Sequence, residues 1–350
     1  MKICLLNNLY PPYNRGGAEK VVAKMAADFK SAGEQVIIIS TKPPKSALVA
    51  QEIPGNIYLP SNFYNLNQHS WFWRLAWHFT DTFSGRQAKQ LSKIFQQEKP
   101  DLIISHNLMG LGLMSVRAIK KSGARHHHFL HDIQLLHPSG LMLYGQEKIL
   151  KTLGAKIYQK LTRYLIGSPE LVKSPSQWLL HEHLERGFFA KSKTEIKRLA
   201  ELKTSSDANL AKKNKPAKQL LFVGQIEEHK GIIFLIKAFQ KFATPDMTLK
   251  IAGAGSQLST AKKLAANDKR LVLLGLLSKD ELIETMKVAD VLLVPSLCYE
   301  NSPTVIYEAK SVGLPVVAAN LGGIPEIITE PDRLFIPADA ADLFKQLTYI

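Results

Sequence analysis

The chain has 350 residues, which suits two domains of ordinary size better than one compact core. Hydrophobic residues make up 45% of the sequence and charged residues 21%, and this composition excludes a disordered chain. Because the only cysteines are Cys4 and Cys298, a disulfide scaffold is excluded as well. The 45 Lys and Arg against 30 Asp and Glu give a net charge of +15, which suggests an anionic partner.

No apolar run approaches the length of a membrane-spanning helix. The N-terminal apolar run Ile3–Leu6 is too short for a signal peptide, and Asn7 and Asn8 interrupt it. We therefore expect a cytoplasmic protein, either free or held peripherally at the inner face of a membrane.

Short apolar runs rich in β-branched residues alternate with segments of helical period along the chain. The runs are Ile3–Leu6, Val36–Ser40, Leu102–Ser105, His127–Leu130, Leu171–Lys173, Leu220–Val223, Leu249–Ala252, Leu271–Leu274, Val291–Val294 and Pro315–Ala318. The helical segments between them include Ala18–Ala32, Ile232–Phe242 and Lys279–Ala289. Continuous apolar runs of this kind are typical of parallel strands covered by helices on both faces. The pattern predicts an α/β fold with two doubly wound, Rossmann-like parallel sheets.

The domain boundary is visible in the composition. The stretch Leu202–Gln219 is polar and lysine-rich, has one proline and shows no apolar period. We therefore expect an N-terminal domain over residues 1–200 and a C-terminal domain over residues 201–350. Two such domains usually hold a ligand in the cleft between them.

The strongest local signal lies in Val294–Pro325. After the predicted strand Val291–Val294 comes an irregular loop with Glu300 and Asn301. Ser302 suits a helix N-cap and Pro303 the first helical position, so we expect a helix that starts here and stops near Gly313. The free N–H groups of its first turn, at Thr304 and Val305, would form an anion site at the carboxyl end of a strand. Glu308 lies inside this helix and can accept hydroxyl hydrogen bonds; taken alone, the pattern is equally a capped helix with surface acids.

A second element, Phe222–Gly231, repeats this topology at the first strand of the second domain. A turn at Gly224 and Gln225 leads to Lys230, which opens a helix and presents a compact cation to an anion bound at the helix N-terminus. The alternative is a solvated surface lysine.

A third element, Leu9–Val22, follows the first strand. Gly16 and Gly17 precede a helix with Glu19 in its first turn, and a double glycine lets the backbone approach a ligand closely. Alone, this pair is also compatible with an ordinary turn.

Together these residues resemble a known family. The sequence E-N-S-P-T-V-I-Y-E from Glu300 to Glu308 resembles the E-x7-E signature of retaining glycosyltransferases of family 4. The H-K-G at His229–Gly231 resembles the lysine-bearing diphosphate motif of that family, and G-G-A-E at Gly16–Glu19 resembles its N-terminal glycine loop. His131-Asp132 resembles the His-Asp pair at the end of a strand of the first domain. The resemblance implies a GT-B fold, with a nucleotide-sugar in the interdomain cleft and no required metal or cofactor.

The resemblance also implies roles for individual residues. Glu308 would bind the donor ribose, Glu300 the donor sugar and Lys230 the diphosphate. His131 would lie beside the donor sugar, so that His131, Lys230 and Glu300 form the expected catalytic set. The remaining donor-binding residues would be Gly16, Gly17, Gly224, Gln225, Asn301, Ser302, Pro303 and Thr304.

Three departures from the family pattern are visible. Gln225 stands where many members carry an arginine, which removes one cation facing the leaving group. Lys310 occupies a helix position that is often small or apolar in the family. The sequence ends at Ile350, whereas members usually continue through a helix that crosses back to the first domain.

The function that follows is transfer of a hexosyl group from a nucleoside-diphosphate sugar to a hydroxyl acceptor, with retention and without a metal. A lipid-linked or cell-envelope polysaccharide intermediate is the expected acceptor. The alternatives are a catalytically silent relative that binds a nucleotide-sugar, and a GT-B epimerase or phosphorylase. We expect no nucleic-acid binding, because the lysines are scattered and no motif of that class occurs.

Two weaker signals leave alternatives open. In His126–His128, His126 and His128 face one side of a strand and His127 the other, which favours packed, hydrogen-bonded rings over a metal site. The aromatic stretch Trp71–Phe79 is either a core helix or an amphipathic element at a membrane surface.

The positive charge is concentrated in one half. Residues 1–200 carry 27 basic and 13 acidic residues, a net +14, whereas residues 201–350 carry 18 and 17, a net +1. Since a donor diphosphate alone would place the excess in the second domain, the charge favours an anionic acceptor or an anionic membrane surface.

Overall fold

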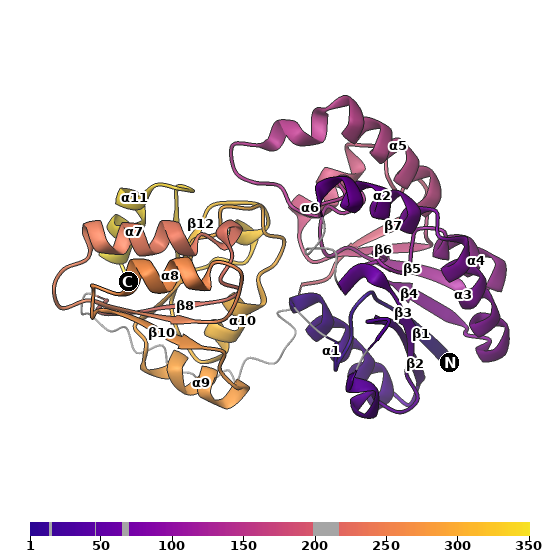
Figure 1. The fold of residues 1–350 in the computed structure, drawn as a ribbon, viewed down its shortest axis with the longest axis horizontal. Helices are drawn as coiled ribbons and strands as arrows, with labels where there is room; N and C mark the ends of the chain where they lie inside the picture. Colours follow the sequence, from indigo (N-terminus) through magenta and orange to yellow (C-terminus); the bar gives the residue numbers. More distant parts are fainter. Residues whose placement is uncertain (14–15, 46, 65–69, 199–216) are drawn as a thin grey trace. The chain divides into compact units, whose positions relative to one another are not determined.

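The computed structural model describes residues 1–13, 16–45, 47–64, 70–198 and 217–350. They form two units, each a parallel sheet with helices packed on it (Figure 1). The first unit comprises Met1–Gly140 and Lys148–Lys197, and the second comprises Leu141–Glu147 and Arg198–Ile350. Most of the expected linker, residues 202–216, lies outside the described residues.

The sheet of the first unit has the order β3-β2-β1-β4-β5-β6-β7, and all its strand pairs are parallel. Its strands are β1 Lys2–Leu6, β2 Gln35–Lys42, β3 Ile57–Pro60, β4 Leu102–Ser105, β5 Arg125–Phe129, β6 Leu171–Ser174 and β7 Lys193–Ile196. The helices are α1 Gly17–Ser31, α2 Trp71–Thr82, α3 Gly85–Glu98, α4 Ser115–Ser122, α5 Leu153–Ile166 and α6 Gln177–Leu184.

The sheet of the second unit has the order β10-β9-β8-β11-β12-β13 and is parallel throughout. Its strands are β8 Gln219–Val223, β9 Thr248–Ala252, β10 Leu271–Gly275, β11 Val291–Val294, β12 Val316–Ala319 and β13 Arg333–Phe335. The helices are α7 Ile232–Phe242, α8 Leu258–Ala265, α9 Lys279–Val288, α10 Thr304–Ser311 and α11 Ala340–Leu347.

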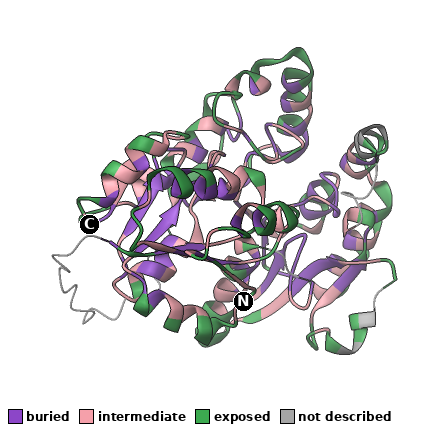
Figure 2. Ribbon diagram, turned by 60° about the vertical axis from the view of Figure 1, so that its left-hand side comes forward, coloured by how far each residue is buried: buried purple, intermediate pink, exposed green. Residues whose placement is uncertain are grey.

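Both faces of the second sheet are covered, as the continuous apolar strands predict. One core cluster joins the sheet to α7, α8 and α11, and the other joins it to α9 and α10. The strands are buried, whereas the outer faces of the helices are exposed (Figure 2). All ten predicted strands are present. The prediction missed β3, β7 and β13, which are short or lie at a sheet edge.

The histidines of β5 are packed and hydrogen-bonded. Ser105 Oγ lies 2.7 Å from His126 Nε2 and 2.9 Å from His128 Nδ1, which places both imidazoles on one face of the strand. His183 is buried nearby and stacks on Phe189 with 5.9 Å between ring centroids. Within the described ranges, no group of three His, Cys, Asp or Glu side chains is placed to hold a metal ion.

The aromatic stretch forms α2, and its rings are divided between core and surface. Trp77 is 8% exposed and packs against Phe63, whereas Phe79 is 67% exposed. Neither alternative for this stretch therefore describes it completely. None of the helices in the described part of the chain is long and apolar enough to cross a membrane.

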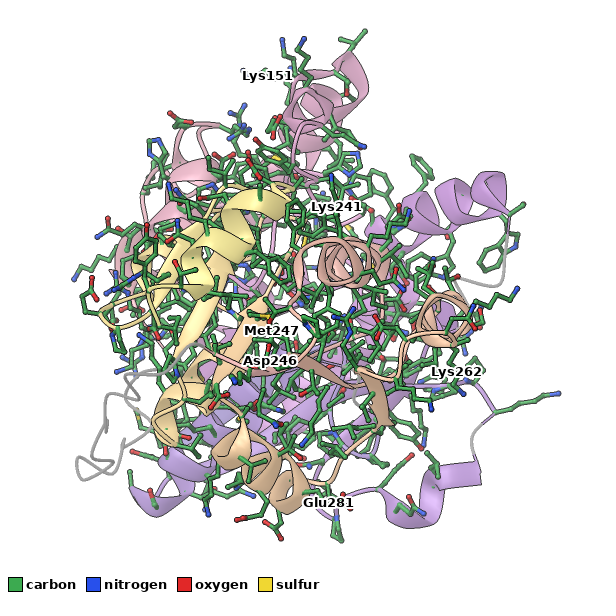
Figure 3. The ribbon with its side chains drawn as sticks, turned by 90° about the vertical axis from the view of Figure 1, so that its left-hand side faces the viewer. Lys151, Lys241, Asp246, Met247, Lys262 and Glu281 are labelled. Atoms are coloured by element: carbon green, nitrogen blue, oxygen red, sulfur yellow. The ribbon has the colours of Figure 1, made fainter. Side chains whose placement is uncertain are left out.

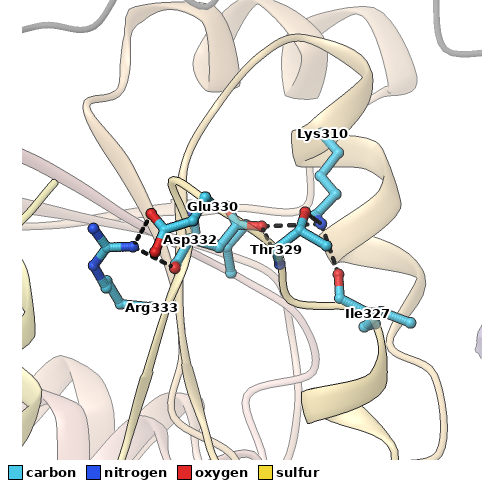
Figure 4. A network of polar contacts seen from close by, with 7 residues as sticks. Lys310, Ile327, Thr329, Glu330, Asp332 and Arg333 are labelled. Carbon is cyan, nitrogen blue, oxygen red and sulfur yellow. Dashed lines mark hydrogen bonds and ion pairs between the residues drawn. The ribbon is translucent and has the colours of Figure 1, made fainter.

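Lys310, the second departure from the family pattern, ties α10 to the loop before β13 (Figure 4). Its Nζ donates to the Ile327 carbonyl at 2.6 Å and to Thr329 Oγ1 at 2.9 Å, and lies 3.0 Å from Asp332 Oδ2. Asp332 is buried, and its Oδ1 accepts the Val316 N–H at 2.9 Å. A lysine at this helix position therefore neutralises a buried carboxylate and, through Asp332, fixes α10 to β12.

Four buried histidines of the first unit, together with the partly buried His131, predict that this unit loses stability in acid. Burial lowers the pKa of His126 and His183 to about 4 and that of His131 to about 3, and it lowers the pKa values of His106 and His128 well below the usual range. Between pH 6.5 and 4, the unfolded chain therefore binds protons that the folded unit does not. Asp81 and Asp132 act in the opposite direction, because burial raises their pKa values to about 7 and about 6.

Since the histidines outnumber the two carboxyls, we expect the free energy of unfolding to fall as the pH falls from 6.5 towards 4. Denaturant unfolding of His183→Leu should show a shallower pH dependence, by up to about 1.4 kcal/mol per pH unit. His181→Gln, which changes an exposed histidine on the same helix, is the matched control. Equal slopes in the two variants would contradict the assignment.

The Lys310 network predicts a second stability effect. Lys310→Met leaves the Asp332 carboxylate buried without its cation, and we expect a loss of about 2–3 kcal/mol in the second unit. Lys287→Met removes an exposed ion pair with Glu284 and should cost less than about 1 kcal/mol. Thermal unfolding of the intact chain measures both, and similar losses in the two variants would argue against a structural role of Lys310.

Candidate active site

The second sheet has its topological switch point between β8 and β11. From β8 the chain moves outward to β9 and β10, and then crosses back to β11 on the other side of β8. The loops that follow these two central strands diverge at their carboxyl ends, which is where open α/β sheets bind ligands. Gly224, Gln225 and Lys230 lie after β8, and Glu300 lies after β11.

An ion pair spans this switch point. Lys230 Nζ donates to Glu300 Oε1 at 2.5 Å, and Ser296 Oγ donates to the same oxygen at 3.0 Å. The side chains are 26% and 14% exposed, so the pair is largely shielded but reachable from solvent. Burial alone would lower the pKa of Lys230, but the Glu300 carboxylate outweighs it and holds this pKa above its usual value. Lys230 is therefore a protonated cation with a carboxylate already seated on it.

Two glycines allow the loops to approach each other this closely. Gly231 has φ +74°, and a Cβ there would lie 1.8 Å from the Pro295 carbonyl oxygen. Gly322 has φ +63°, and a Cβ there would lie 2.3 Å from the Glu300 carbonyl oxygen. That carbonyl accepts the Gly323 N–H at 2.8 Å. The backbone of Glu300 is thus fixed by the loop after β12 as well as by its own.

A segment from the middle of the chain also fixes the Glu300 loop. Leu141–Glu147 lies between two stretches of the first unit in sequence but packs in the second unit. The Tyr144 N–H donates to the Leu297 carbonyl at 2.9 Å, and the Tyr299 N–H donates to the Met142 carbonyl at 2.9 Å. These bonds add a short antiparallel pairing to the loop immediately before Glu300.

A side-chain bond closes the same pairing. Tyr299 Oη donates to Glu147 Oε1 at 2.8 Å. Hydrogen bonds from its own backbone, and then from Tyr299 and Gly145, hold the pKa of Glu147 below its usual value. The Glu147 carboxylate is therefore a stable hydrogen-bond acceptor for Tyr299, the residue that directly precedes Glu300.

Helix α10 differs from the prediction in its first residue. Helix α10 begins at Thr304, with Pro303 at the N-cap position and no side-chain cap. The expected N-cap, Ser302, lies one residue too early, and its hydroxyl instead lies 2.8 Å from Tyr307 Oη. The prediction of Ser302 as cap and Pro303 as first helical residue is therefore wrong by one position. The half-buried Asn301 and Glu308 flank the start of the helix.

Gly224 and Gln225 follow β8 directly. The Gly224 N–H donates to the Ala252 carbonyl at 3.1 Å, which holds the turn against β9. Gln225 is exposed, so its side chain stands at the surface of this loop.

The remaining predicted residues belong to the first unit. Gly17 begins α1, and the Gly16 N–H donates to the buried Glu19 carboxylate at 3.1 Å. The neighbouring Arg15, a basic residue that can replace the cation lost at Gln225, lies outside the described residues.

His131 follows β5 and pairs with a histidine that the sequence did not single out. His131 Nε2 lies 2.8 Å from His106 Nδ1, and both rings stack on Phe129. Burial lowers the pKa of His131 to about 3, so its imidazole is neutral at pH 7. His106 Nε2 is buried without a hydrogen-bond partner. His131 and His106 line a cavity of about 20 Å³ that also contains Asp132.

Sequence analysis missed His106, Ser296 and the Leu141–Glu147 segment. His106 comes directly after β4, which with β1 forms the switch point of the first sheet. Ser296 likewise follows β11. The carboxyl ends of these central strands were a usable signal for both residues. In Leu141–Glu147, no apolar periodicity or sequence motif indicates that the segment packs in the second unit.

Two family models match the chain. "Glycosyltransferase Family 4" matches residues 15–196, which is about half of the chain, and "Glycosyl transferases group 1" matches residues 203–350.

Among the related sequences, a 42.6 kDa uncharacterized protein in the cps region of Klebsiella pneumoniae is 28% identical over 98% of this chain and 91% of its own. The N-acetyl-alpha-D-glucosaminyl L-malate synthase of Bacillus anthracis is 23% identical over 96% of this chain and 84% of its own.

Solved structures with the same fold cover 99% of this chain. The sucrose-phosphate synthase of Thermosynechococcus elongatus has a TM-score of 0.71 at 18% identity, with 88% of its chain covered. HepE of Anabaena, solved in complex with UDP, has a TM-score of 0.69 at 19% identity, with 89% covered. With two parallel-sheet units of the GT-B type and a family model over half its length, the chain belongs to glycosyltransferase family 4.

Proposed function

We propose that this glycosyltransferase moves a hexosyl group from a nucleoside-diphosphate sugar to a hydroxyl acceptor with retention of configuration, using no metal or cofactor. The observation that carries the proposal is the Lys230–Glu300 pair at the switch point of the second sheet. A protonated lysine there matches the diphosphate, and a carboxylate beside it matches sugar hydroxyls.

The pair suggests how the donor is received. In the structure the Glu300 carboxylate forms an ion pair with the Lys230 ammonium group. An incoming diphosphate carries more negative charge and replaces Glu300 on Lys230, which frees the carboxylate to accept hydroxyl hydrogen bonds from the donor sugar. The ion pair therefore keeps Lys230 charged and in position before the donor arrives.

The reaction proceeds by breaking the bond between C1 of the sugar and the diphosphate oxygen, whose electron pair leaves with the diphosphate. Lys230 and the free N–H groups at the start of α10 stabilise the growing charge. The acceptor oxygen bonds to C1 on the face that the diphosphate leaves, and its proton passes to the departing phosphate oxygen. His131, neutral at pH 7, exchanges a hydrogen bond with the donor sugar. Glu308 binds the ribose.

The acceptor we propose is a lipid-linked or cell-envelope polysaccharide intermediate that carries negative charge. The net +14 of residues 1–200 supports an anionic acceptor or an anionic membrane surface on the N-terminal, acceptor-side domain. The relative encoded in a cps region, similar over nearly the whole length, is compatible with this acceptor class.

One observation favours a second candidate, a silent relative that binds a nucleotide-sugar without turnover. Gln225 replaces a cation of the family pattern and can offer only a neutral hydrogen bond to the diphosphate. Calorimetric titration with nucleoside diphosphates, followed by product analysis, separates the candidates. Binding without any product would favour the silent relative.

Turnover should depend on both assigned donor residues. With a panel of UDP-, GDP- and ADP-sugars, we expect Lys230→Ala to lower kcat/KM by about 100- to 1,000-fold, because leaving-group charge is no longer neutralised. Glu308→Ala should raise the donor KM by about 10-fold or more, because a charged hydrogen bond to the ribose is lost.

Lys237→Ala, an exposed lysine on α7, is the matched control and should keep full activity. Full activity in both Lys230→Ala and Glu308→Ala would remove the assigned roles.

A further inference from the structure

Three of the four most exposed large apolar side chains in the described part of the first unit lie on α5 and do not face its core. Leu153 is 76% exposed, Ile157 62% and Tyr164 74%. Leu153 and Ile157 are four positions apart, and Ile157 and Tyr164 are seven apart, so the three side chains share one face of the helix. An apolar stripe that points outward on a helix marks an interaction surface when it is more than a single residue.

The opposite face of α5 is the one that holds it to its unit. Ala155, Leu165 and Ile166 are buried there. Thr162 Oγ1 donates to the Leu135 carbonyl at 2.6 Å, and Gln159 Nε2 donates to the Leu136 carbonyl at 3.2 Å. Since apolar and polar contacts already anchor this face, the outward stripe is not needed for packing.

The stripe is flanked by cations and by no acids. Residues 148–166 contain five basic residues and no Asp or Glu. The basic residues, all exposed, are Lys148, Lys151, Lys156, Lys160 and Arg163. None of the four lysines forms an ion pair among the described residues, and Figure 3 shows Lys151 at the outer end of this region. Lys156 and Lys160 lie one turn apart, beside Ile157.

We propose that α5, with the residues from Lys148 onward, is the element by which this protein docks on an anionic lipid surface. Apolar side chains at the centre of a helix face, with lysines beside them, are the composition of helices that lie in the headgroup layer of a membrane. The charge of this surface favours a lipid partner over a second copy of the chain. Its five cations, with no acid among them, repel the same face of another copy and attract anionic headgroups. This inference concerns where the protein binds and stands apart from the proposed reaction.

Vesicle co-sedimentation of the full chain tests it. The wild-type protein should bind vesicles of phosphatidylglycerol and phosphatidylcholine, bind pure phosphatidylcholine much less, and dissociate as salt rises. Lys156→Gln with Lys160→Gln should weaken binding to anionic vesicles by about 10-fold or more. Leu153→Ser with Ile157→Ser should weaken it to a similar degree, while leaving nucleoside-diphosphate binding unchanged.

Three matched variants serve as controls. Lys262→Gln with Lys263→Gln removes two exposed lysines from α8, and Val272→Ser with Val288→Ser removes two exposed apolar residues of the second unit. Phe79→Ser with Phe83→Ser removes the exposed rings at the end of α2, the competing aromatic surface of the first unit. All three should bind vesicles like the wild type.

Several outcomes would overturn the assignment. Unchanged vesicle binding in both α5 variants, or loss confined to the Phe79 and Phe83 variant, would move the surface away from α5. A dimer in analytical ultracentrifugation that Leu153→Ser with Ile157→Ser dissociates would assign the stripe to self-association instead. Equal binding to neutral and anionic vesicles would contradict the role of the lysines.

Discussion

The structure of the second unit centres on one partly buried ion pair, Lys230 with Glu300. Its two residues come from loops that leave the neighbouring central strands β8 and β11. Lys230 Nζ and Glu300 Oε1 lie 2.5 Å apart because the strand order of the sheet reverses between these two strands. Desolvating a lysine and a carboxylate costs several kcal/mol, and such a pair persists only where its geometry is well fixed. The surrounding contacts all act on that geometry: Gly231 against Pro295, Gly322 against the Glu300 carbonyl, and the Leu141–Glu147 segment.

The Leu141–Glu147 segment has a consequence for how the two halves of the chain are coupled. This segment has residues of the first unit on both sides of it in sequence, yet it pairs with the loop that carries Glu300. We expect a change in the first unit that moves this segment to be felt at Glu300 without any direct contact to the donor. Tyr299 and Glu147 transmit it, because their hydrogen bond joins the segment to the residue next to Glu300.

Much of the fold was predictable because buried parallel strands appear in the sequence as continuous apolar runs. Ten apolar runs became strands, and the helices Ile232–Phe242 and Lys279–Ala289 appeared within one residue of their predicted ends. The edge strands Ile57–Pro60 and Arg333–Phe335 were missed because they are only four and three residues long, too short for a clear apolar run. In the sequence, Lys310 is a departure from the family pattern without an evident reason. The structure explains the lysine, because its side chain pairs with the buried Asp332.

The candidate site was predictable only where it is local in sequence. Glu300, Lys230 and His131 come from motifs. The partner of His131, His106, follows β4, which is a neighbour of β5 only in the folded sheet, and Ser296 lies four residues before Glu300 but belongs to no motif. Ser302 was misplaced because a good capping residue before a proline is a tendency, and here its hydroxyl turned to Tyr307 instead. No local rule predicts that Leu141–Glu147 leaves its own unit.

The most direct test of the central claim is the affinity of Glu300→Gln for nucleoside diphosphates, measured by calorimetry with UDP, GDP and ADP. If Glu300 occupies the cation that the diphosphate needs, its neutral isostere should bind the preferred nucleotide roughly 10-fold more tightly, because the competing charge is gone. Turnover of the nucleotide-sugar should fall in the same variant, since the sugar loses its carboxylate partner. Unchanged or weaker nucleotide binding would contradict the claim that Glu300 occupies the cation that the diphosphate needs.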